Sequence, residues 1–192
     1  MRTLVNATIF LLLSIVGGLG SAWYMVEVGS PLTTERTGPW KLWTLAGKPE
    51  ADPYTRANLA RSGRLPMTSS TAHYYLASTD SNGRRLLATC EYMIEGTGPS
   101  GLWWSLAIYD DLGQIFANPV QRYAYNSSTV LRATNGSYQI TLARALRPGN
   151  WLPVAGSRPL ALVLRVYLPE ASADTNAEPA GADLPVIKRI AC

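Results

Sequence analysis

The strongest constraint on the fold is a segment without any charged residue, residues 3–26, at the start of the chain. A helix needs about 20 consecutive apolar residues to cross a bilayer, and the pair Trp23-Tyr24 lies where aromatic side chains meet a membrane surface. One arginine precedes the segment and a glutamate follows it, which favours a cytoplasmic N-terminus. The sequence therefore predicts a single transmembrane helix in residues 1–26, with residues 27–192 on the exported side.

A cleavable signal peptide is the alternative to this anchor. Gly20-Ser21-Ala22 offers small residues at a spacing that suits a signal peptidase. The length of the segment and the aromatic pair near its end favour the uncleaved anchor. Either interpretation exports the rest of the chain.

Small residues also recur along the apolar segment. Ser14, Gly18 and Ala22 are spaced by four residues, so they share one helix face and form a small-xxx-small pattern. This pattern is consistent with a weak homodimer through the membrane. A monomeric helix is the alternative, because small residues are common in such segments.

The chain has two cysteines, Cys90 and Cys192, and in an oxidising compartment an even number predicts a disulfide. Cys90 belongs to an alternating apolar series that turns its thiol inward: Leu86, Ala88, Cys90, Tyr92 and Ile94. Cys192 is the last residue, where a covalent bond restricts an otherwise frayed end. Two separate buried thiols are the alternative.

Charge and residue usage exclude several classes of function. The net charge is +4, and the 17 basic residues are scattered along the chain rather than gathered in a run, whereas nucleic-acid binding needs a clustered basic face. His73 is the single histidine, so we expect no multi-histidine metal site and no cofactor. No Gly-x-Ser-x-Gly motif is present. Glu91 and Glu95 would lie ~13 Å apart along a strand, too far for the paired carboxylates of a glycosidase.

Residues 27–70 form a lead-in to the main domain and contain one clear helix signal. Asp52 is suited to be an N-cap, Pro53 follows in the first turn, and Gly63 comes just past the end. We therefore expect a short helix from Pro53 to Ser62. The lead-in is also rich in tryptophan and leucine, so it should lie along the domain rather than in water.

The remaining residues, 71–192, have the pattern of an all-β domain, with apolar residues that alternate between turn signals. Three turns separate strand-like runs and predict hairpins: Asp80-Ser81-Asn82-Gly83, Asp111-Leu112-Gly113 and Asn135-Gly136. The polar segment 171–183 predicts a loop before the last strand. Together these signals predict an antiparallel β-sandwich of jelly-roll-like form with one short helix, preceded by the transmembrane helix.

One face of two strands remains after their apolar sides are turned inward. It carries Trp103, Tyr109, Arg165 and Tyr167. Aromatic rings beside an arginine can stack on a sugar or bind an anionic group. The alternative is that the lead-in covers this face with Trp40 and Trp43.

A second group of residues predicts a structural corner: Asp110, Asn118, Arg122 and Trp151. Asn118 begins a turn, and Arg122 could form a bidentate pair with Asp110 across a hairpin. Trp151 lies in "PGNWLPVAG", between two strand-like runs, where Pro and Gly break regular structure. We interpret it as a plug that closes the end of the sandwich and whose indole N–H needs one acceptor. A ligand platform is the alternative.

Several motifs, in order, resemble a known family. "GLWWSLAIYDDLG", "NPVQRYAY", "GNWLP", "PLALVLRVYLPE" and "LPVIKR" are similar to the bacterial domain-of-unknown-function family 1214, over about residues 101–189. "GPWKLWTLAGKPEADPYTRA" looks like the lead-in of its short, membrane-anchored members, which lack the family 1254 domain. The resemblance implies a jelly-roll-like β-sandwich in a Gram-negative envelope, and it brings no agreed catalytic residues.

We therefore expect a protein anchored in the bacterial inner membrane by a single span, with its C-terminal domain in the periplasm. Our first hypothesis is a non-catalytic binding or accessory protein whose partner is an envelope glycan or protein. The alternative is a metal-independent envelope hydrolase acting on a glycan or an amide. A deep pocket with several polar groups of shifted pKa would favour the enzyme.

Overall fold

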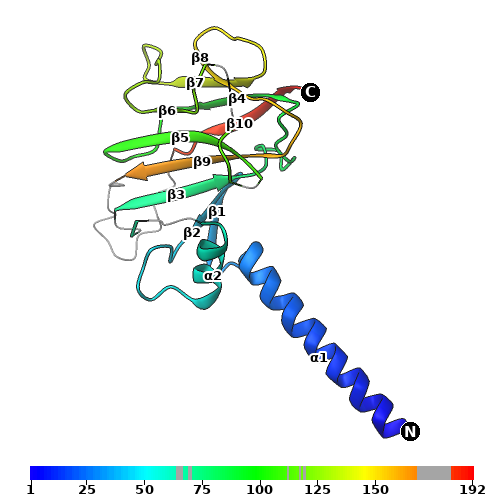
Figure 1. The fold of residues 1–192 in the computed structure, drawn as a ribbon. Coiled ribbons are helices and arrows are strands. Elements are labelled where there is room, and N and C mark those ends of the chain that lie inside the picture. The colour runs from blue at the N-terminus through cyan, green and yellow to red at the C-terminus, as the bar shows by residue number, and fades with distance from the viewer. Residues whose placement is uncertain (64–66, 69–70, 112, 117, 119, 168–182) are drawn as a thin grey trace.

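The computed structural model describes residues 1–63, 67–68, 71–111, 113–116, 118, 120–167 and 183–192 (Figure 1). All of the predicted 171–183 loop except Asp183 lies outside these residues. So does Leu112 of the second predicted turn. The described chain is mostly β, with two helices.

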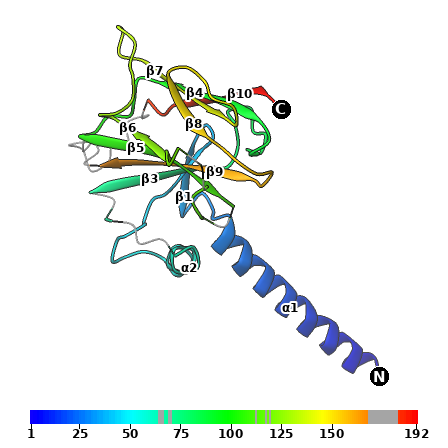
Figure 2. The same cartoon turned by 45° about the horizontal axis from the view of Figure 1, so that its top comes forward.

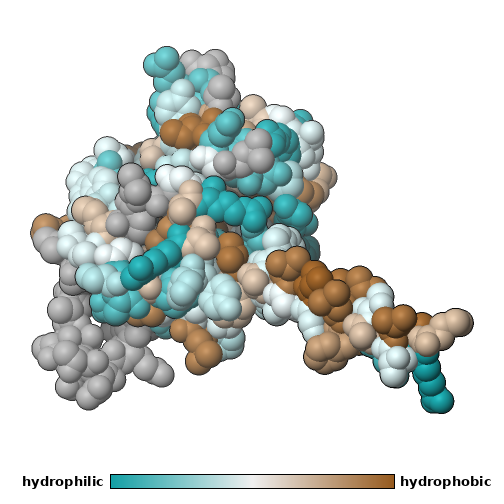
Figure 3. Space-filling view, turned by 60° about the horizontal axis from the view of Figure 1, so that its bottom comes forward, coloured by the Kyte–Doolittle hydropathy of each residue, from teal (hydrophilic) through white to brown (hydrophobic). Residues whose placement is uncertain are grey.

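Helix α1 (Arg2–Glu27) projects from the rest of the molecule, and none of its residues is buried (Figures 1 and 3). It is long and apolar enough to cross a membrane. A signal sequence at an N-terminus meets the same criteria, so the helix supports both interpretations of residues 1–26. Figure 3 shows the apolar surface along the helix.

Helix α2 (Pro53–Arg61) confirms the helix expected in the lead-in. The Asp52 carboxylate accepts hydrogen bonds from the backbone N–H groups of Tyr54 and Thr55, at 2.9 and 3.0 Å. These bonds satisfy donors that have no partner inside the helix. Pro53 occupies the first turn, where its missing N–H costs nothing.

The described strands form two sheets. The larger has the order β1-β2-β3-β9-β5-β6: β1 (Thr34–Thr37), β2 (Trp40–Trp43), β3 (Ala72–Ala77), β9 (Leu160–Tyr167), β5 (Trp103–Asp110) and β6 (Ala124–Asn126). The smaller has the order β10-β4-β7-β8: β10 (Val186–Ala191), β4 (Glu91–Gly96), β7 (Tyr138–Ala143) and β8 (Asn150–Pro153). The segment 27–70 thus supplies the hairpin β1-β2 of the larger sheet (Figure 1).

The chain reverses at each of the three predicted turns, but the predicted pairing of long strands across them is wrong. Each turn is closed by a single isolated bridge: Thr79↔Arg85, Tyr109↔Ile115 and Arg132↔Tyr138. Beyond its turn, β3 pairs with β2 and β9, whereas β4 pairs with β10 and β7 in the other sheet. A turn signal fixes only the local reversal, and the burial of apolar faces decides which strands pair.

Strand β8 departs from the predicted antiparallel pairing, because it runs parallel to β7. Residues 144–149 carry the chain back, so that Asn150 pairs beside Ile140. Pro153 ends this edge strand, where a missing N–H is tolerated. The Trp151 indole donates to the carbonyl of Ala143 at 2.9 Å, and the residue is 7% exposed.

Both sheets contribute to one hydrophobic core. The predicted inward series is confirmed, since Leu86, Ala88, Cys90, Tyr92 and Ile94 are all buried. Trp40 of β2 also lies in this core, and its indole donates to the carbonyl of Pro185 at 2.8 Å. The N-terminal hairpin therefore packs against the segment that leads into the last strand.

The predicted disulfide between Cys90 and Cys192 is confirmed, with the two Cα atoms 4.0 Å apart. It ties the last residue to the chain just before β4, across a sequence separation of 102 residues. A bond that closes so long a loop removes much of the freedom of the unfolded chain.

Asp80 forms a second tie to the C-terminal strand. Its carboxylate is buried, accepts the backbone N–H groups of Asn82 and Arg84, and pairs with the guanidinium groups of Arg84 at 3.0 Å and Arg189 at 3.4 Å. Burial alone would raise the pKa of Asp80, but the hydrogen bonds and the charge of Arg84 lower it below its ordinary value. Arg189 belongs to β10, so this carboxylate helps hold the strand in place.

Replacing both cysteines, in C90S/C192S, should lower the free energy of unfolding by about 2–4 kcal/mol, because the unfolded chain regains the freedom of the opened loop. Denaturant unfolding of wild type and variant, each with and without reductant, measures the loss. Reductant should destabilise the wild type alone. Alkylation of both thiols in the unreduced wild type would contradict the bond.

D80N should lower the free energy of unfolding by about 1–3 kcal/mol at pH 7. The substitution removes the buried negative charge, while the new amide still offers one oxygen as a hydrogen-bond acceptor. Since the folded-state pKa is lowered, the stabilisation is present above the unfolded value of 3.8 and is lost as the pH falls through the folded value. The difference in unfolding free energy between wild type and D80N should therefore stay constant down to about pH 4 and shrink as the pH falls below 3.8. E50Q, at an exposed position, is the matched control. A difference that does not shrink at low pH would contradict the role of the charge.

Candidate functional site

The outer face of the larger sheet carries the candidate site. In β9, Val163 and Arg165 point away from the core, while Leu162, Leu164 and Val166 point into it. The register places Tyr74 of β3 opposite Arg165. The central strand thus has an apolar inner face and an outer face that combines apolar, aromatic and cationic groups.

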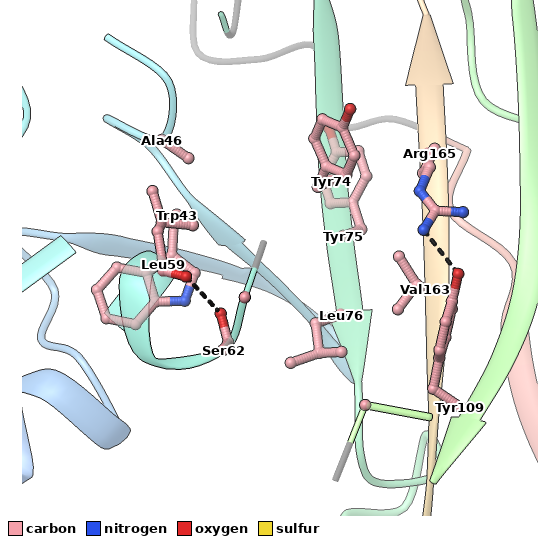
Figure 4. A pocket seen from close by; sticks show the side chains of 12 residues that line it. Trp43, Ala46, Leu59, Ser62, Tyr74, Tyr75, Leu76, Tyr109, Val163 and Arg165 are labelled. Atoms are coloured by element: carbon pink, nitrogen blue, oxygen red, sulfur yellow. Dashed lines mark hydrogen bonds between the residues drawn. The ribbon is translucent and has the colours of Figure 1, made fainter. Parts of the chain in front are cut away.

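A pocket of about 430 Å³ opens between this face and helix α2 (Figure 4). This volume lies within the range of about 300–1,000 Å³ that is typical of small-molecule sites. The pocket is lined by Trp43, Ala46, Leu59, Ser62, Gly63, Tyr74, Tyr75, Leu76, Tyr109, Gly113, Val163 and Arg165. Figure 4 shows Tyr109 and Arg165 on the sheet side and Leu59 and Trp43 on the side of α2.

Arg165 is the charged residue of the lining, and two tyrosines hold it. Its guanidinium donates a hydrogen bond to the Tyr109 hydroxyl at 2.7 Å. The Cζ atom of Arg165 lies 5.6 Å from the centre of the Tyr109 ring and 6.0 Å from the centre of the Tyr74 ring. Ser105 and Ala107 are small outward residues of β5 beside its path. The side chain can therefore extend along the sheet toward Tyr109.

Arg165 forms no ion pair with a carboxylate within the described part of the chain. Other arginines do: the exposed Arg158 pairs with Asp110 and Asp111, and the partly buried Arg189 pairs with Asp80. A half-buried guanidinium that is held by aromatic rings and lacks a counter-charge is suited to bind an anion.

The four residues predicted for a binding face divide into two pairs. Tyr109 and Arg165 meet in the pocket, as described. Trp103 and Tyr167 contact each other at one end of the same face, with ring centroids 5.3 Å apart. Burial raises the pKa of Tyr167, and the electrostatic effect of the neighbouring Tyr74 raises it further. Tyr74 therefore connects the two pairs.

The alternative that the lead-in covers this face is half right. Trp40 lies in the core between the sheets, so it does not cover the face. Trp43 does lie on the outer side, where it forms a wall of the pocket beside α2 and leaves the space in front of Arg165 open (Figure 4). Strand alternation explains the difference, because the two residues are three positions apart and so face opposite sides.

Sequence reasoning missed the wall formed by α2 and the role of Tyr74. The alternation in "AHYYLAST" could have placed Tyr74 on the outer face, since Tyr75 is buried in the core. Nothing in the sequence could have shown that Leu59, Ser62 and Gly63 face the sheet across the pocket.

The predicted corner exists with different partners. Asp110 pairs with Arg158 at 3.2 Å rather than with Arg122 as expected. Arg122 instead donates to the Trp151 carbonyl at 3.3 Å, and Asn118 bonds both the N–H and the carbonyl of Arg122. Arg122 therefore links the Asn118 turn to β8, and Trp151 is a buried packing residue rather than a platform.

The glutamates and the histidine considered from the sequence lie apart from the pocket, in contacts of their own. Glu91 pairs with Arg147 at 2.6 Å and Glu95 with Lys188 at 2.5 Å. His73 lies outside the pocket lining, where its Nδ1 is 3.3 Å from the Tyr75 hydroxyl. Within the part of the chain that the structure describes, no group of His, Cys, Asp and Glu could hold a metal.

Comparison with known proteins confirms the resemblance. The family model "Protein of unknown function (DUF1214)" matches residues 71–171. The crystal structure of VPA0106 from Vibrio parahaemolyticus has a similar fold, with a TM-score of 0.57 and 22% identity over 73% of this chain. This chain spans 36% of the length of VPA0106. An uncharacterised protein from Burkholderia cenocepacia matches at 21% identity over 62% of this chain and 29% of its own, with a TM-score of 0.40. No curated protein matches the sequence.

W103A and R165A should each fold and lose little stability, because neither side chain belongs to the core between the sheets. We expect a loss of about 0.5–1.5 kcal/mol for the ring contact of Trp103. L106A, from the buried side of β5, is the control and should cost about 2–5 kcal/mol. Denaturant unfolding compares the three. A loss for W103A or R165A as large as that of L106A would make these residues packing residues.

Proposed function

The chain belongs to the DUF1214 family, whose function is unknown, and we propose that it is a non-catalytic binding protein of the bacterial envelope. In this proposal α1 anchors the chain in the inner membrane, and the β-sandwich lies in the periplasm. The length and apolarity of α1 and the disulfide support this location. Its site is the pocket between the larger sheet and α2, and its ligand is a small anionic molecule.

One observation carries the proposal: the Arg165 guanidinium faces a pocket without a carboxylate partner among the described residues. The hydrogen bond to Tyr109 occupies one of five N–H donors of a guanidinium and fixes its direction. The others can bind a carboxylate, phosphate or sulfate group of a ligand. A half-buried charge costs free energy unless a partner compensates it, so binding an anion repays part of this cost.

The described lining of the pocket offers few groups that could catalyse hydrolysis. Its described lining contains no carboxylate and no imidazole to act as a base. The Ser62 hydroxyl donates to the Leu59 carbonyl at 3.2 Å, without an activating partner. Burial raises the pKa of Tyr75 to about 12, which keeps it protonated at neutral pH. We therefore prefer binding to catalysis.

R165Q tests this function. A panel of soluble carboxylates, phosphates and sulfonates, including aromatic ones, is screened by thermal unfolding of the full chain in detergent. At least one compound should raise the Tm of the wild type, because a ligand that binds the folded state alone stabilises by about 2.7 kcal/mol at 100 times Kd.

The same compound should leave R165Q unchanged. R85Q is the matched control, because Arg85 is an exposed arginine outside the pocket lining, and this variant should respond like the wild type. If no anion stabilises the wild type, or if R165Q responds as strongly as R85Q, the proposed function is wrong.

A further inference from the structure

Helix α2 belongs both to the pocket and to the junction with the anchor. Leu59, Ser62 and Gly63, at the end of α2 and just past it, line the pocket. Asn58 donates its side-chain amide to the carbonyl of Val26 at 2.8 Å, and Arg61 pairs with Glu27 at 2.7 Å. One short helix thus forms a pocket wall on one side and holds the last turn of α1 on the other (Figures 1 and 2).

The surroundings of this junction suit a membrane surface. Trp23 and Tyr24, near the end of α1, are 60% and 53% exposed, as expected for side chains at the level of lipid headgroups. Leu32, in the turn that follows α1, is 88% exposed. With α1 in the membrane, the wall of the pocket at α2 stands next to the outer headgroup layer.

The pocket lining is polar on the side of the sheet and apolar on the side of α2, which is the side nearer to the anchor. Arg165 and the Tyr109 hydroxyl lie on the sheet side, whereas Trp43, Ala46 and Leu59 form an apolar wall on the side of α2 (Figure 4). Leu76 and Val163 lie between them on the floor. A ligand that satisfies both parts has an anionic head on Arg165 and an apolar tail that extends toward α2.

The size and charge of the pocket limit which class of ligand can bind. A volume of about 430 Å³ is near the lower end of the range for small-molecule sites, which suits one acyl chain better than a two-chain lipid. One guanidinium, with no second cation in the described lining, balances a single negative charge. A carboxylate matches the planar fork of a guanidinium through two parallel hydrogen bonds.

We propose, building on the binding function proposed above, that the pocket binds the carboxylate form of a single-chain fatty acid taken from the adjacent membrane leaflet. The carboxylate contacts Arg165 beside Tyr109, and the chain lies over Val163 and Leu76 toward Leu59. Because the same helix holds α1, the ligand enters from the membrane side without crossing open water.

Native mass spectrometry of the detergent-solubilised full chain tests this with four probes: laurate, dodecanol, acetate and dodecyl phosphate. Laurate should give one adduct per chain and bind at least tenfold more tightly than each of the others. R165Q should bind laurate at least tenfold more weakly and no better than dodecanol, while R85Q should keep the affinity of the wild type.

The variant A46F tests the apolar part of the pocket separately from Arg165. The added ring fills the apolar side of the pocket, so laurate should be lost while any weak binding of acetate remains. Thermal unfolding of each variant without ligand confirms that it is folded.

The outcomes separate the two proposals. If acetate binds as tightly as laurate and depends on Arg165, the anion site stands and the acyl-chain assignment is wrong. If dodecanol binds the wild type as tightly as laurate does, the pocket does not recognise the carboxylate head. If dodecyl phosphate binds more tightly than laurate, the choice of a carboxylate is wrong. If no probe binds in an Arg165-dependent way, both the ligand class and the anion site in this pocket are wrong.

Discussion

The pairing of β9 with β3 on one side and β5 on the other is the interaction on which the rest of the structure depends. Eight residue pairs join β9 to β5 and six join it to β3. Because side chains alternate, this register decides at once which residues enter the core and which face outward. A shift of one residue would bury Arg165 among the leucines of the core and expose Leu164, so the core and the pocket are fixed by the same hydrogen bonds.

Alternation and capping were the parts of the fold that the sequence could predict well, because both are local. The inward series around Cys90, the helix that begins at Pro53 and the outward position of Arg165 all follow from spacing or from a single cap. The strand partners were not predictable in this way. The turns at Asp80–Gly83 and at Gly136 reverse the chain, yet no strand pairs with its neighbour across either turn: β4 pairs with β7 and β10, and β7 pairs with β4 and β8.

The candidate site shows the same division. Tyr109 and Arg165 could be grouped from alternation within two strands, and they do meet. The opposite wall comes from α2, more than forty residues earlier than β5, and only the packing of the lead-in brings it there. For the same reason the partner of Asp110 was misassigned to Arg122, although Arg158 lies closer once β9 is in place. Sequence predicts faces of strands, and tertiary packing decides what stands across from them.

The ties to the C-terminal end also limit how the chain can be assembled. The last residue is bonded to Cys90, and the indole of Trp40 donates to the carbonyl of Pro185, 145 residues away. Contacts this distant in sequence are slow to form. The smaller sheet also has β10 along its edge, paired with β4, so it stays incomplete until β10 has been synthesised. The smaller sheet therefore closes late, and until β10 pairs with β4 the unpaired edge of β4 is open to aggregation.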